Sequence, residues 1–325
     1  MPSAYIRGIG KYLPERILAS GELEKKLGLD PGWIESKTGV GERRIAAEDE
    51  FPSTMAARAA EAILADAALP PEDIEMIIVA TSMPDMFFPS TAGMVQTKLG
   101  LKDIPAFDLL NACSGFLYGV AAAAAFIEAG HYGNILVIGA EVMSRMLDWN
   151  DYRTCILFGD AAAGVLVSSE GKHRILGFHL GADGEKGHVL ALRGGGSRHP
   201  CSAVTLENKL HTLHMDGGEV FRFAMARLGE AVKAAAEKTG CALEKISLIL
   251  PHQSNARIVE EAAKILALPM DRFFLNLNNR GNTAAASVPL ALCEAAESGK
   301  LQPGGLAALA SYGAGLAWAS CIVEW

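Results

Sequence analysis

The feature that most constrains this chain is a pattern of polar turn, small-residue helix, glycine-containing turn and apolar strand that occurs twice. The copies are "NACSGFLYGVAAAAAFIEAGHYGNILVIGAE" (111–141) and "GNTAAASVPLALCEAAESGKLQPGGLAALASYG" (281–313), and each leads into a glycine-containing hairpin. Helices that are apolar all round are buried, and their small residues allow close packing. We therefore expect two similar halves, residues 1–171 and 172–325, whose small-residue helices begin near a common centre on a pseudo-twofold axis.

Apolar runs and helical patterns alternate along the chain. The runs typical of buried strands are 76–83, 134–141, 162–169, 246–253 and 306–313. The helical patterns are 53–67, 90–99, 113–129, 218–239, 254–267 and 283–298. Strands that alternate with helices predict an α/β fold with buried, largely parallel sheets.

Composition excludes several classes of function. The chain has 29 Lys and Arg against 37 Asp and Glu, a net charge of -8, and no basic run, so we expect no nucleic-acid surface. Six scattered cysteines without CxxC or Cys/His ligand spacing predict free thiols and no metal site, which fits a reducing cytoplasm. The N-terminal residues lack a signal-peptide pattern. The uncharged stretch 301–323 is interrupted by Pro and Gly, so we expect two strands and a turn instead of a membrane span.

Cys113 stands where the first small-residue helix is expected to begin. A thiol at that place lies near the positive end of the helix dipole, which favours the thiolate. A thiolate attacks thioesters and transfers acyl groups. A small buried core cysteine would fit the same sequence.

Two residues of the second half could complete a site with this thiol. His252 follows the apolar run of "LILPHQSNARI", and functional groups of α/β proteins gather at the carboxyl ends of strands. Asn282 opens the helix that mirrors the Cys113 helix, where an asparagine can also serve only as an N-cap. A nucleophile, an imidazole and an amide donor together could hold one acyl thioester and polarise the carbonyl of another.

The chain resembles the β-ketoacyl-acyl-carrier-protein synthase III family of the thiolase superfamily over essentially its whole length. Besides the three segments above, the resemblance rests on "WIESKTGVGERRIA", "FPSTAGMVQTKLGL", "DYRTCILFGDAAAG", "HMDGGEVFRFA" and "SYGAGLAWAS". It implies a thiolase-like duplicated five-layer αβαβα fold and a homodimer. It also implies decarboxylative Claisen condensation of an acyl-CoA primer with malonyl-acyl carrier protein, the step that initiates fatty-acid synthesis, with no cofactor because the CoA thioester is a substrate.

The resemblance implies a role for each central residue. Cys113 would take the acyl group from CoA. His252 and Asn282 would bind the malonyl thioester carbonyl and stabilise the enolate that forms as CO2 leaves. The backbone N–H groups of Cys113 and Ala314 would form an oxyanion hole, which small residues in "SYGAG" allow to lie close.

The resemblance also implies residues along a substrate tunnel. Trp33 would stack on the CoA adenine with Arg153 on the other side, and Lys37 stands where the family usually has Arg beside a CoA phosphate. The candidates for lining the pantetheine arm are Gly217, Phe221, Ser254 and Asn255. Phe88 would reach across the dimer to close the acyl pocket. An ordinary half-buried Trp33 and a core Phe88 are the alternatives.

Three cations match positions that meet the acyl carrier protein in the family. They are Arg222, Arg257 and Lys264. Carrier proteins are acidic, so an acidic enzyme needs a local basic patch to steer them. Three solvated surface charges are the alternative.

The chain departs from the family pattern near the proposed site. Leu110 and Asn111 precede the cysteine in place of the usual residues, Tyr312 replaces a common Phe in the acyl pocket, and Arg280 fills a variable position. A cation near the pocket could accept a primer that ends in a carboxylate. The alternative function is therefore a related enzyme of a specialised pathway that uses a non-acetyl primer, including a dicarboxylic acyl-CoA, or transfers acyl groups without condensation.

Two other enzyme classes are disfavoured. A thiolase needs a second catalytic cysteine in the C-terminal half, and "SYGAG" contains none. A papain-like hydrolase needs a different sequence around its thiol.

Overall fold

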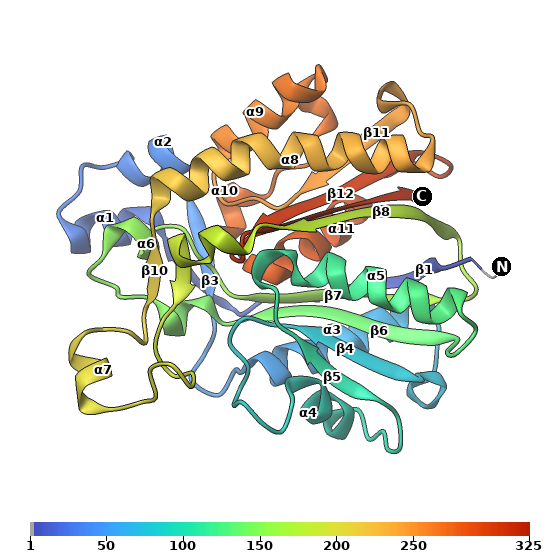
Figure 1. Ribbon diagram of the computed structural model, residues 1–325, viewed down its shortest axis with the longest axis horizontal. Helices are drawn as coiled ribbons and strands as arrows, with labels where there is room; N and C mark the ends of the chain where they lie inside the picture. The colour runs from blue at the N-terminus through green and yellow to red at the C-terminus, as the bar shows by residue number, and fades with distance from the viewer. Residues whose placement is uncertain (1–2) are drawn as a thin grey trace.

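Two layers of strands enclose a pair of helices in the computed structural model, which describes residues 3–325 (Figure 1). One outer layer contains α8 (Gly217–Thr239) and α9 (Ala256–Leu266). The first strand layer contains β8 (His173–Ala182), β11 (Ile246–Pro251), β12 (Leu306–Gly313) and β13 (Ala317–Glu324). The middle helices are α5 (Gly115–Glu128) and α11 (Ser287–Glu297).

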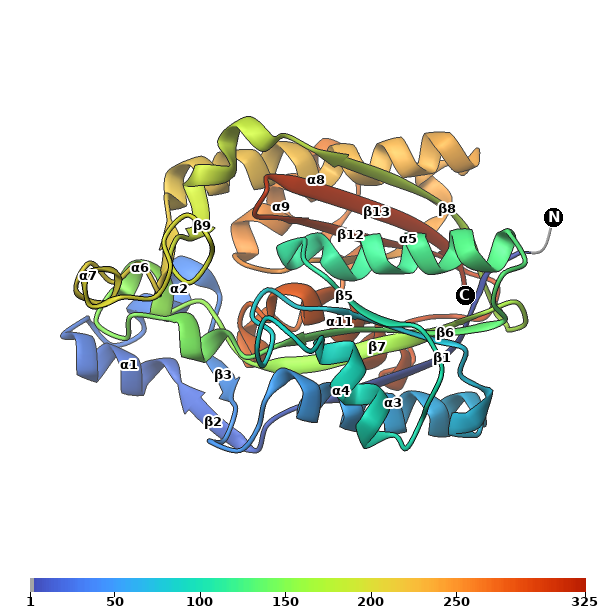
Figure 2. The same cartoon turned by 60° about the horizontal axis from the view of Figure 1, so that its bottom comes forward.

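The remaining two layers lie on the other side of α5 and α11. The second strand layer contains β1 (Tyr5–Tyr12), β4 (Met76–Ala80), β5 (Ala106–Leu109), β6 (Asn134–Glu141) and β7 (Ala161–Ser168). The helices α3 (Pro52–Ala67) and α4 (Thr91–Lys98) cover its outer face (Figure 2). The arrangement is the αβαβα layering that the resemblance predicted.

The two strand layers are joined by hydrogen bonds at one narrow place. The strand order is β11-β12-β13-β8-β1-β7-β6-β4-β5, and β8 pairs with β1 only at Arg174 with Tyr5 and His173 with Ile6. Parallel pairs occur between β4 and β5, β4 and β6, and β11 and β12; the other neighbours are antiparallel. The prediction of largely parallel sheets is therefore wrong, because β12 returns directly into β13 through a short turn that only antiparallel neighbours allow.

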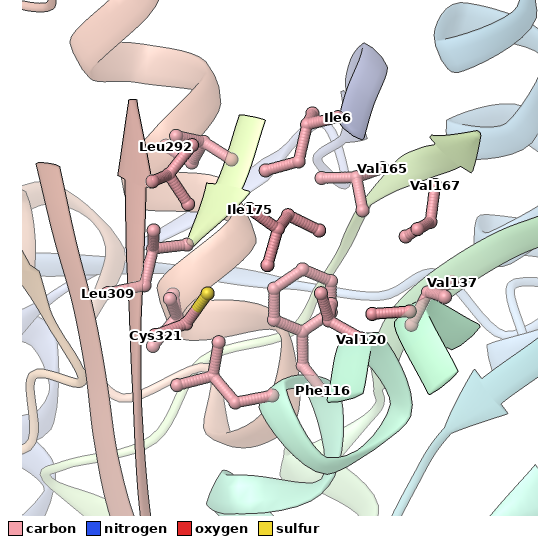
Figure 3. Packing of buried hydrophobic residues seen from close by; sticks show 14 of the residues in the cluster. Ile6, Phe116, Val120, Val137, Val165, Val167, Ile175, Leu292, Leu309 and Cys321 are labelled. Carbon is pink, nitrogen blue, oxygen red and sulfur yellow. The ribbon is translucent and has the colours of Figure 1, made fainter. Parts of the chain in front are cut away.

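The main core surrounds α5 (Figure 3). Phe116 and Val120 of this helix pack between Leu309 on one strand layer and Val137 and Val165 on the other. Because α5 meets a strand layer on each of two faces, it has little need for a polar side. This burial explains its alanine-rich, nearly uncharged sequence.

The two small-residue helices begin with the same backbone turn. A 3-10 turn at Ala112–Ser114 precedes α5, another at Ala284–Ala286 precedes α11, and the two turns contact each other. Ala112 has φ 44° and Ala284 has φ 47°, a left-handed conformation that is uncommon outside glycine. The division of the chain into halves at residues 171 and 172 stays a prediction.

Smaller elements gather at one end of the layers, where β6 and β12 finish (Figure 2). They are β2 (Arg16–Ala19), α1 (Ser20–Leu27), α2 (Trp33–Thr38), β3 (Glu42–Ile45), α6 (Tyr152–Cys155), β9 (Leu190–Leu192), α7 (Ala203–Glu207), β10 (Leu213–Met215) and α10 (Leu277–Arg280). Within residues 3–325, no helix is both long enough and apolar enough to cross a membrane. The stretch 301–323 contributes β12, a turn and most of β13, as expected.

Candidate active site

Cys113 lies in the turn between β5 and α5 and faces the end of β12. The residue is 7% exposed. A Cβ atom placed on Gly313 would lie 2.9 Å from the Cys113 nitrogen and 3.0 Å from its Cβ. Glycine at 313 therefore allows a backbone approach that any side chain would prevent.

A cavity of about 460 Å³ opens beside this thiol. Its wall includes Cys113 and Ala314 and is otherwise mainly apolar, with Met143, Met146, Phe158, Leu190, Leu192 and Leu213 among the lining residues. No charged side chain among residues 3–325 lines it. The cavity suits an uncharged, apolar group held next to the sulfur.

His252 follows the carboxyl end of β11, as the sequence predicted. Its backbone N–H donates to the Ala310 carbonyl at 2.7 Å, and its side chain is buried. Its ring centroid lies 4.9 Å from that of Tyr312. Burial lowers the pKa of His252 to about 3, so the imidazole is neutral at neutral pH.

Asn282 is held by its backbone and by one side of its amide. Its N–H donates to the Leu157 carbonyl at 2.8 Å, and its Oδ1 accepts a 2.9 Å hydrogen bond from the N–H of Ala284. This bond is a local turn and not a helix cap, because the N-cap positions of the 3-10 turn and of α11 are Thr283 and Ala286, and neither makes a side-chain capping bond. Within the described part of the chain, the Asn282 side chain makes its hydrogen bond through Oδ1 and none through Nδ2.

The structure brings these three predicted residues to the same region. Ala284, which orients Asn282, lines the cavity together with Cys113. Tyr312 contacts the His252 ring and is close enough to Cys113 for a charge on the sulfur to raise the Tyr312 pKa, in addition to the larger effect of burial. His252 and Asn282 themselves are not among the described residues that line the cavity.

Two backbone donors near the sulfur are free. Among residues 3–325, neither the N–H of Cys113 nor that of Ala314 donates to a backbone carbonyl. Ala314 lies in the turn after Gly313, and Gly315, the next residue, has φ 139°, a conformation that favours glycine. The glycines thus shape a turn that can present an N–H beside the thiol.

The expectation that the helix dipole favours a thiolate is wrong for this state of the chain. Burial, with a smaller effect of the nearby Glu141 carboxylate, raises the pKa of Cys113 to about 12. Only the N–H of Cys113 itself acts in the opposite direction. Removal from water therefore keeps the thiol neutral at rest, as it does the imidazole of His252.

Glu141 is a feature that the sequence analysis missed. It ends β6, is fully buried, and accepts hydrogen bonds from the Ser82 backbone N–H at 3.0 Å and hydroxyl at 2.8 Å. Burial raises its pKa to about 7. The available signal was a carboxylate at the end of the otherwise apolar run "NILVIGAE".

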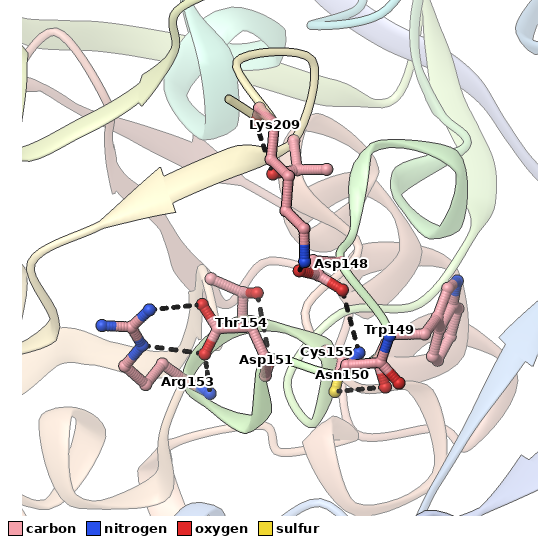
Figure 4. A network of polar contacts seen from close by, with 9 residues as sticks. Asp148, Trp149, Asn150, Asp151, Arg153, Thr154, Cys155 and Lys209 are labelled. Atoms are coloured by element: carbon pink, nitrogen blue, oxygen red, sulfur yellow. Dashed lines mark hydrogen bonds and ion pairs between the residues drawn. The ribbon is translucent and has the colours of Figure 1, made fainter. Parts of the chain in front are cut away.

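The residues predicted for the CoA arm lie in α2 and α6, at the end of the layers where β6 and β12 finish (Figure 2). Trp33 meets Tyr152 edge-to-face, with centroids 6.0 Å apart. Arg153 is exposed, and its guanidinium donates two hydrogen bonds of 2.8 Å to the Asp151 carboxylate (Figure 4). Its guanidinium is therefore already paired in this state.

The predicted pantetheine residues lie at or near the starts of α8 and α9. Gly217 begins α8, and Phe221 lies one turn further on. Asn255 caps α9 and donates to the Lys37 carbonyl at 3.2 Å. This bond brings Lys37 and Asn255 together from distant parts of the sequence.

Phe88 is 85% exposed, so the alternative of a core phenylalanine is wrong.

Arg280 is neither a cation at the acyl pocket nor a charge that points to solvent. Its Nε donates to the Glu294 carboxylate at 2.8 Å in a partly buried pair, so it neither points to solvent nor serves the acyl cavity. The pairing of Arg280 with Glu294 on α11 could not be predicted from the local sequence.

The three predicted carrier-protein contacts lie on α8 and α9. Arg222 pairs with Glu219 and Lys264 pairs with Glu261, each on its own helix. Arg257 forms no ion pair with any residue in 3–325. In the same range, no group of three or more His, Cys, Asp or Glu side chains could hold a metal ion.

Comparison with known proteins identifies the family. Residues 107–184 match the family model for 3-oxoacyl-[acyl-carrier-protein] synthase III, and residues 236–325 match the model for its C-terminal part. A β-ketoacyl-[acyl-carrier-protein] synthase III of Caldanaerobacter subterraneus is 47% identical over 99% of this chain and 98% of its own length. The chain belongs to the β-ketoacyl-[acyl-carrier-protein] synthase III family.

Other members agree in sequence and in structure. The Desulfitobacterium hafniense synthase III (strain DCB-2) is 45% identical over 100% of this chain and 98% of its own. The crystal structure of the Aquifex aeolicus synthase III superposes with a TM-score of 0.90 at 39% identity, covering 99% of this chain and 100% of that one. The chain is thus a synthase III acyltransferase with the thiolase-like fold, and the family's reaction is the condensation that initiates fatty-acid synthesis.

Proposed function

We propose that Cys113, His252 and Asn282 carry out this condensation between an acyl-CoA primer and malonyl-acyl carrier protein. One observation carries the proposal: the buried thiol lines an apolar cavity, and each of the other two groups contacts a residue beside that thiol. His252 packs against Tyr312, whose pKa responds to Cys113, and Asn282 accepts a hydrogen bond from Ala284 of the cavity wall. Family membership supplies the reaction type, and the geometry suggests the residues.

The first step transfers the primer to the enzyme. The Cys113 sulfur attacks the thioester carbonyl, the bond from the acyl carbon to the CoA sulfur breaks, and the thiol proton ends on the departing CoA thiol. Because the pKa of Cys113 is raised to about 12, the proton leaves as the new bond forms. The N–H groups of Cys113 and Ala314 would stabilise the oxyanion, and each donor of this type contributes about 3 kcal/mol.

The second step forms the new carbon–carbon bond. The neutral His252 and the Nδ2 group of Asn282 would donate to the malonyl thioester oxygen. The carbon–carboxylate bond breaks, CO2 departs, and the enolate carbon attacks the acyl carbon on Cys113. The cysteine leaves as a thiolate and regains a proton. A neutral imidazole suits this role because it can donate without first being charged.

Several finer assignments belong to the same proposal. We place CoA along Trp33, Lys37 and Arg153, and the pantetheine arm along Gly217, Phe221, Ser254 and Asn255. We propose that Arg222, Arg257 and Lys264 meet the carrier protein and that the enzyme needs no cofactor. We also propose that it is a cytoplasmic homodimer in which Phe88 reaches across to close the acyl pocket. Membrane and nucleic-acid partners are not part of the proposal.

The geometry favours a primer with an apolar acyl chain. The cavity beside Cys113 has no charged side chain in its wall, and Arg280 is committed to Glu294. A primer that ends in a carboxylate would therefore find no cation in the cavity wall formed by residues 3–325.

The test separates labelling from condensation. The protein is incubated with acetyl-, isobutyryl-, octanoyl- and glutaryl-CoA, digested and analysed by mass spectrometry, and CO2 release from malonyl-acyl carrier protein is measured in parallel. We expect acyl groups on Cys113 only, none from glutaryl-CoA, and no label in Cys113→Ser. His252→Ala and Asn282→Ala should reduce CO2 release by about 10²-fold or more.

Cys201→Ser is the matched control, because it removes an exposed thiol outside the site. It should label and condense like the wild type. Acylation of another cysteine, or full CO2 release by both His252→Ala and Asn282→Ala, contradicts the assignment.

A further inference from the structure

Tyr312 contacts His252 through its ring and Ser254 through its hydroxyl. The residue lies on β12 and is 2% exposed. Its ring meets His252 edge-to-face at 61° and 4.9 Å between centroids. Its hydroxyl lies 2.7 Å from the Ser254 hydroxyl.

His252 has few other restraints on its ring. The hydrogen bond of His252 is made by its backbone N–H, and the ring atom Nδ1 is buried without a partner among residues 3–325. The orientation of the imidazole therefore depends on packing. Tyr312 supplies the aromatic edge of that packing.

Ser254 connects this packing to the start of α9. The next residue, Asn255, caps α9 by accepting from the Arg257 N–H at 3.0 Å and also donates to the Lys37 carbonyl. A displacement of Ser254 would thus change both the Tyr312 hydroxyl contact and the turn that carries two of the proposed pantetheine residues, Ser254 and Asn255.

We propose that Tyr312 is a positioning residue for His252, locked by its hydroxyl–hydroxyl bond to Ser254, and that this lock acts in the condensation step. The inference rests on the proposed role of His252. Phenylalanine at 312 would keep the aromatic edge but leave the Ser254 hydroxyl without this partner. The aromatic ring at position 312 and the His252 imidazole would then pack less tightly. A reaction slows when a catalytic group is displaced from its working position.

The test compares Tyr312→Phe, Ser254→Ala and the double variant. We expect each single variant to lower kcat for CO2 release by about tenfold, part of the ~10²-fold cost of a 1 Å misplacement. In Tyr312→Phe, KM for malonyl-acyl carrier protein and single-turnover acylation of Cys113 should each change by less than about twofold, whereas Ser254→Ala, which also removes a proposed pantetheine contact, is compared by kcat alone. The double variant should be no slower than either single variant, because both remove the same bond.

Tyr12→Phe is the matched control. Its hydroxyl accepts from Arg58 Nη1 at 3.0 Å on β1, so the variant makes the same substitution away from the site. Thermal unfolding of all variants checks the fold. An equal loss in acylation and condensation, a change in KM alone, additive losses, or wild-type kcat in Tyr312→Phe each overturns the inference. A wild-type protein that acylates but releases no CO2 instead overturns the proposed function.

Discussion

At the residue scale, the charge states of the site follow from burial. Cys113 and His252 are ionisable groups kept neutral because the protein interior disfavours their charged forms. Glu141 is kept close to neutrality by the same cause, although hydrogen bonds from Ser82 act against it. An acyl group can therefore be accepted in a site that holds little charge.

Glu141 predicts a pH dependence of stability. Its pKa of about 7 in the fold exceeds the ordinary value of 4.5, so its favourable contribution is present below about pH 4.5 and is lost as pH rises through 7. Over that range the wild type should lose up to about 3 kcal/mol from this group. Glu141→Gln has no such group to ionise.

Urea unfolding at pH 5 and pH 8 measures this effect. The stability of Glu141→Gln relative to the wild type should increase between the two pH values. Glu207→Gln, the same change on an exposed side chain, controls for the substitution itself. A difference between Glu141→Gln and the wild type that stays constant from pH 5 to pH 8 contradicts the account.

At the element scale, the turn after β12 determines how closely the oxyanion donors approach the sulfur. Gly313→Ala would place a Cβ 2.9 Å from the Cys113 nitrogen, so one of the two backbones must shift. We expect single-turnover acylation to fall by about 10²-fold or more, the typical cost of losing one oxyanion donor. Gly184→Ala is the control, since its added Cβ would meet nothing within 4 Å.

The elements also differ in how well the sequence predicted them. The strands at 134–141 and 306–313 were predicted with their observed bounds, and helices such as α3 and α8 were predicted within about one residue, because the apolar period is a local property. The left-handed turns at Ala112 and Ala284 were not foreseen, since no glycine marks them.

At the scale of the whole molecule, an apolar patch remains exposed. Met86, Phe87, Phe88 and Leu110 are 50%, 77%, 85% and 75% exposed. A soluble chain rarely leaves such side chains grouped in water unless another surface covers them. The patch supports the proposed homodimer.

Phe88→Asp should convert the proposed dimer to a monomer and reduce acyl transfer. A buried carboxylate would oppose association because it loses its hydration. Size-exclusion chromatography with light scattering measures the mass, and Leu206→Asp, at a side chain that is 57% exposed in α7, is the control. A Phe88→Asp protein with wild-type mass contradicts the assignment of this patch.

The sequence by itself determined the repeated strand–helix pattern, the buried small-residue helices and the candidates Cys113, His252 and Asn282, because each depends on residue type and local period. Only the tertiary structure decided the antiparallel neighbours in the sheet, the pairing of Arg280 with Glu294, the hydroxyl partner of Tyr312 and the neutral state of the thiol. These properties depend on which distant segments exclude water from a side chain or offer it a partner. The linear sequence does not state which segments come together in space.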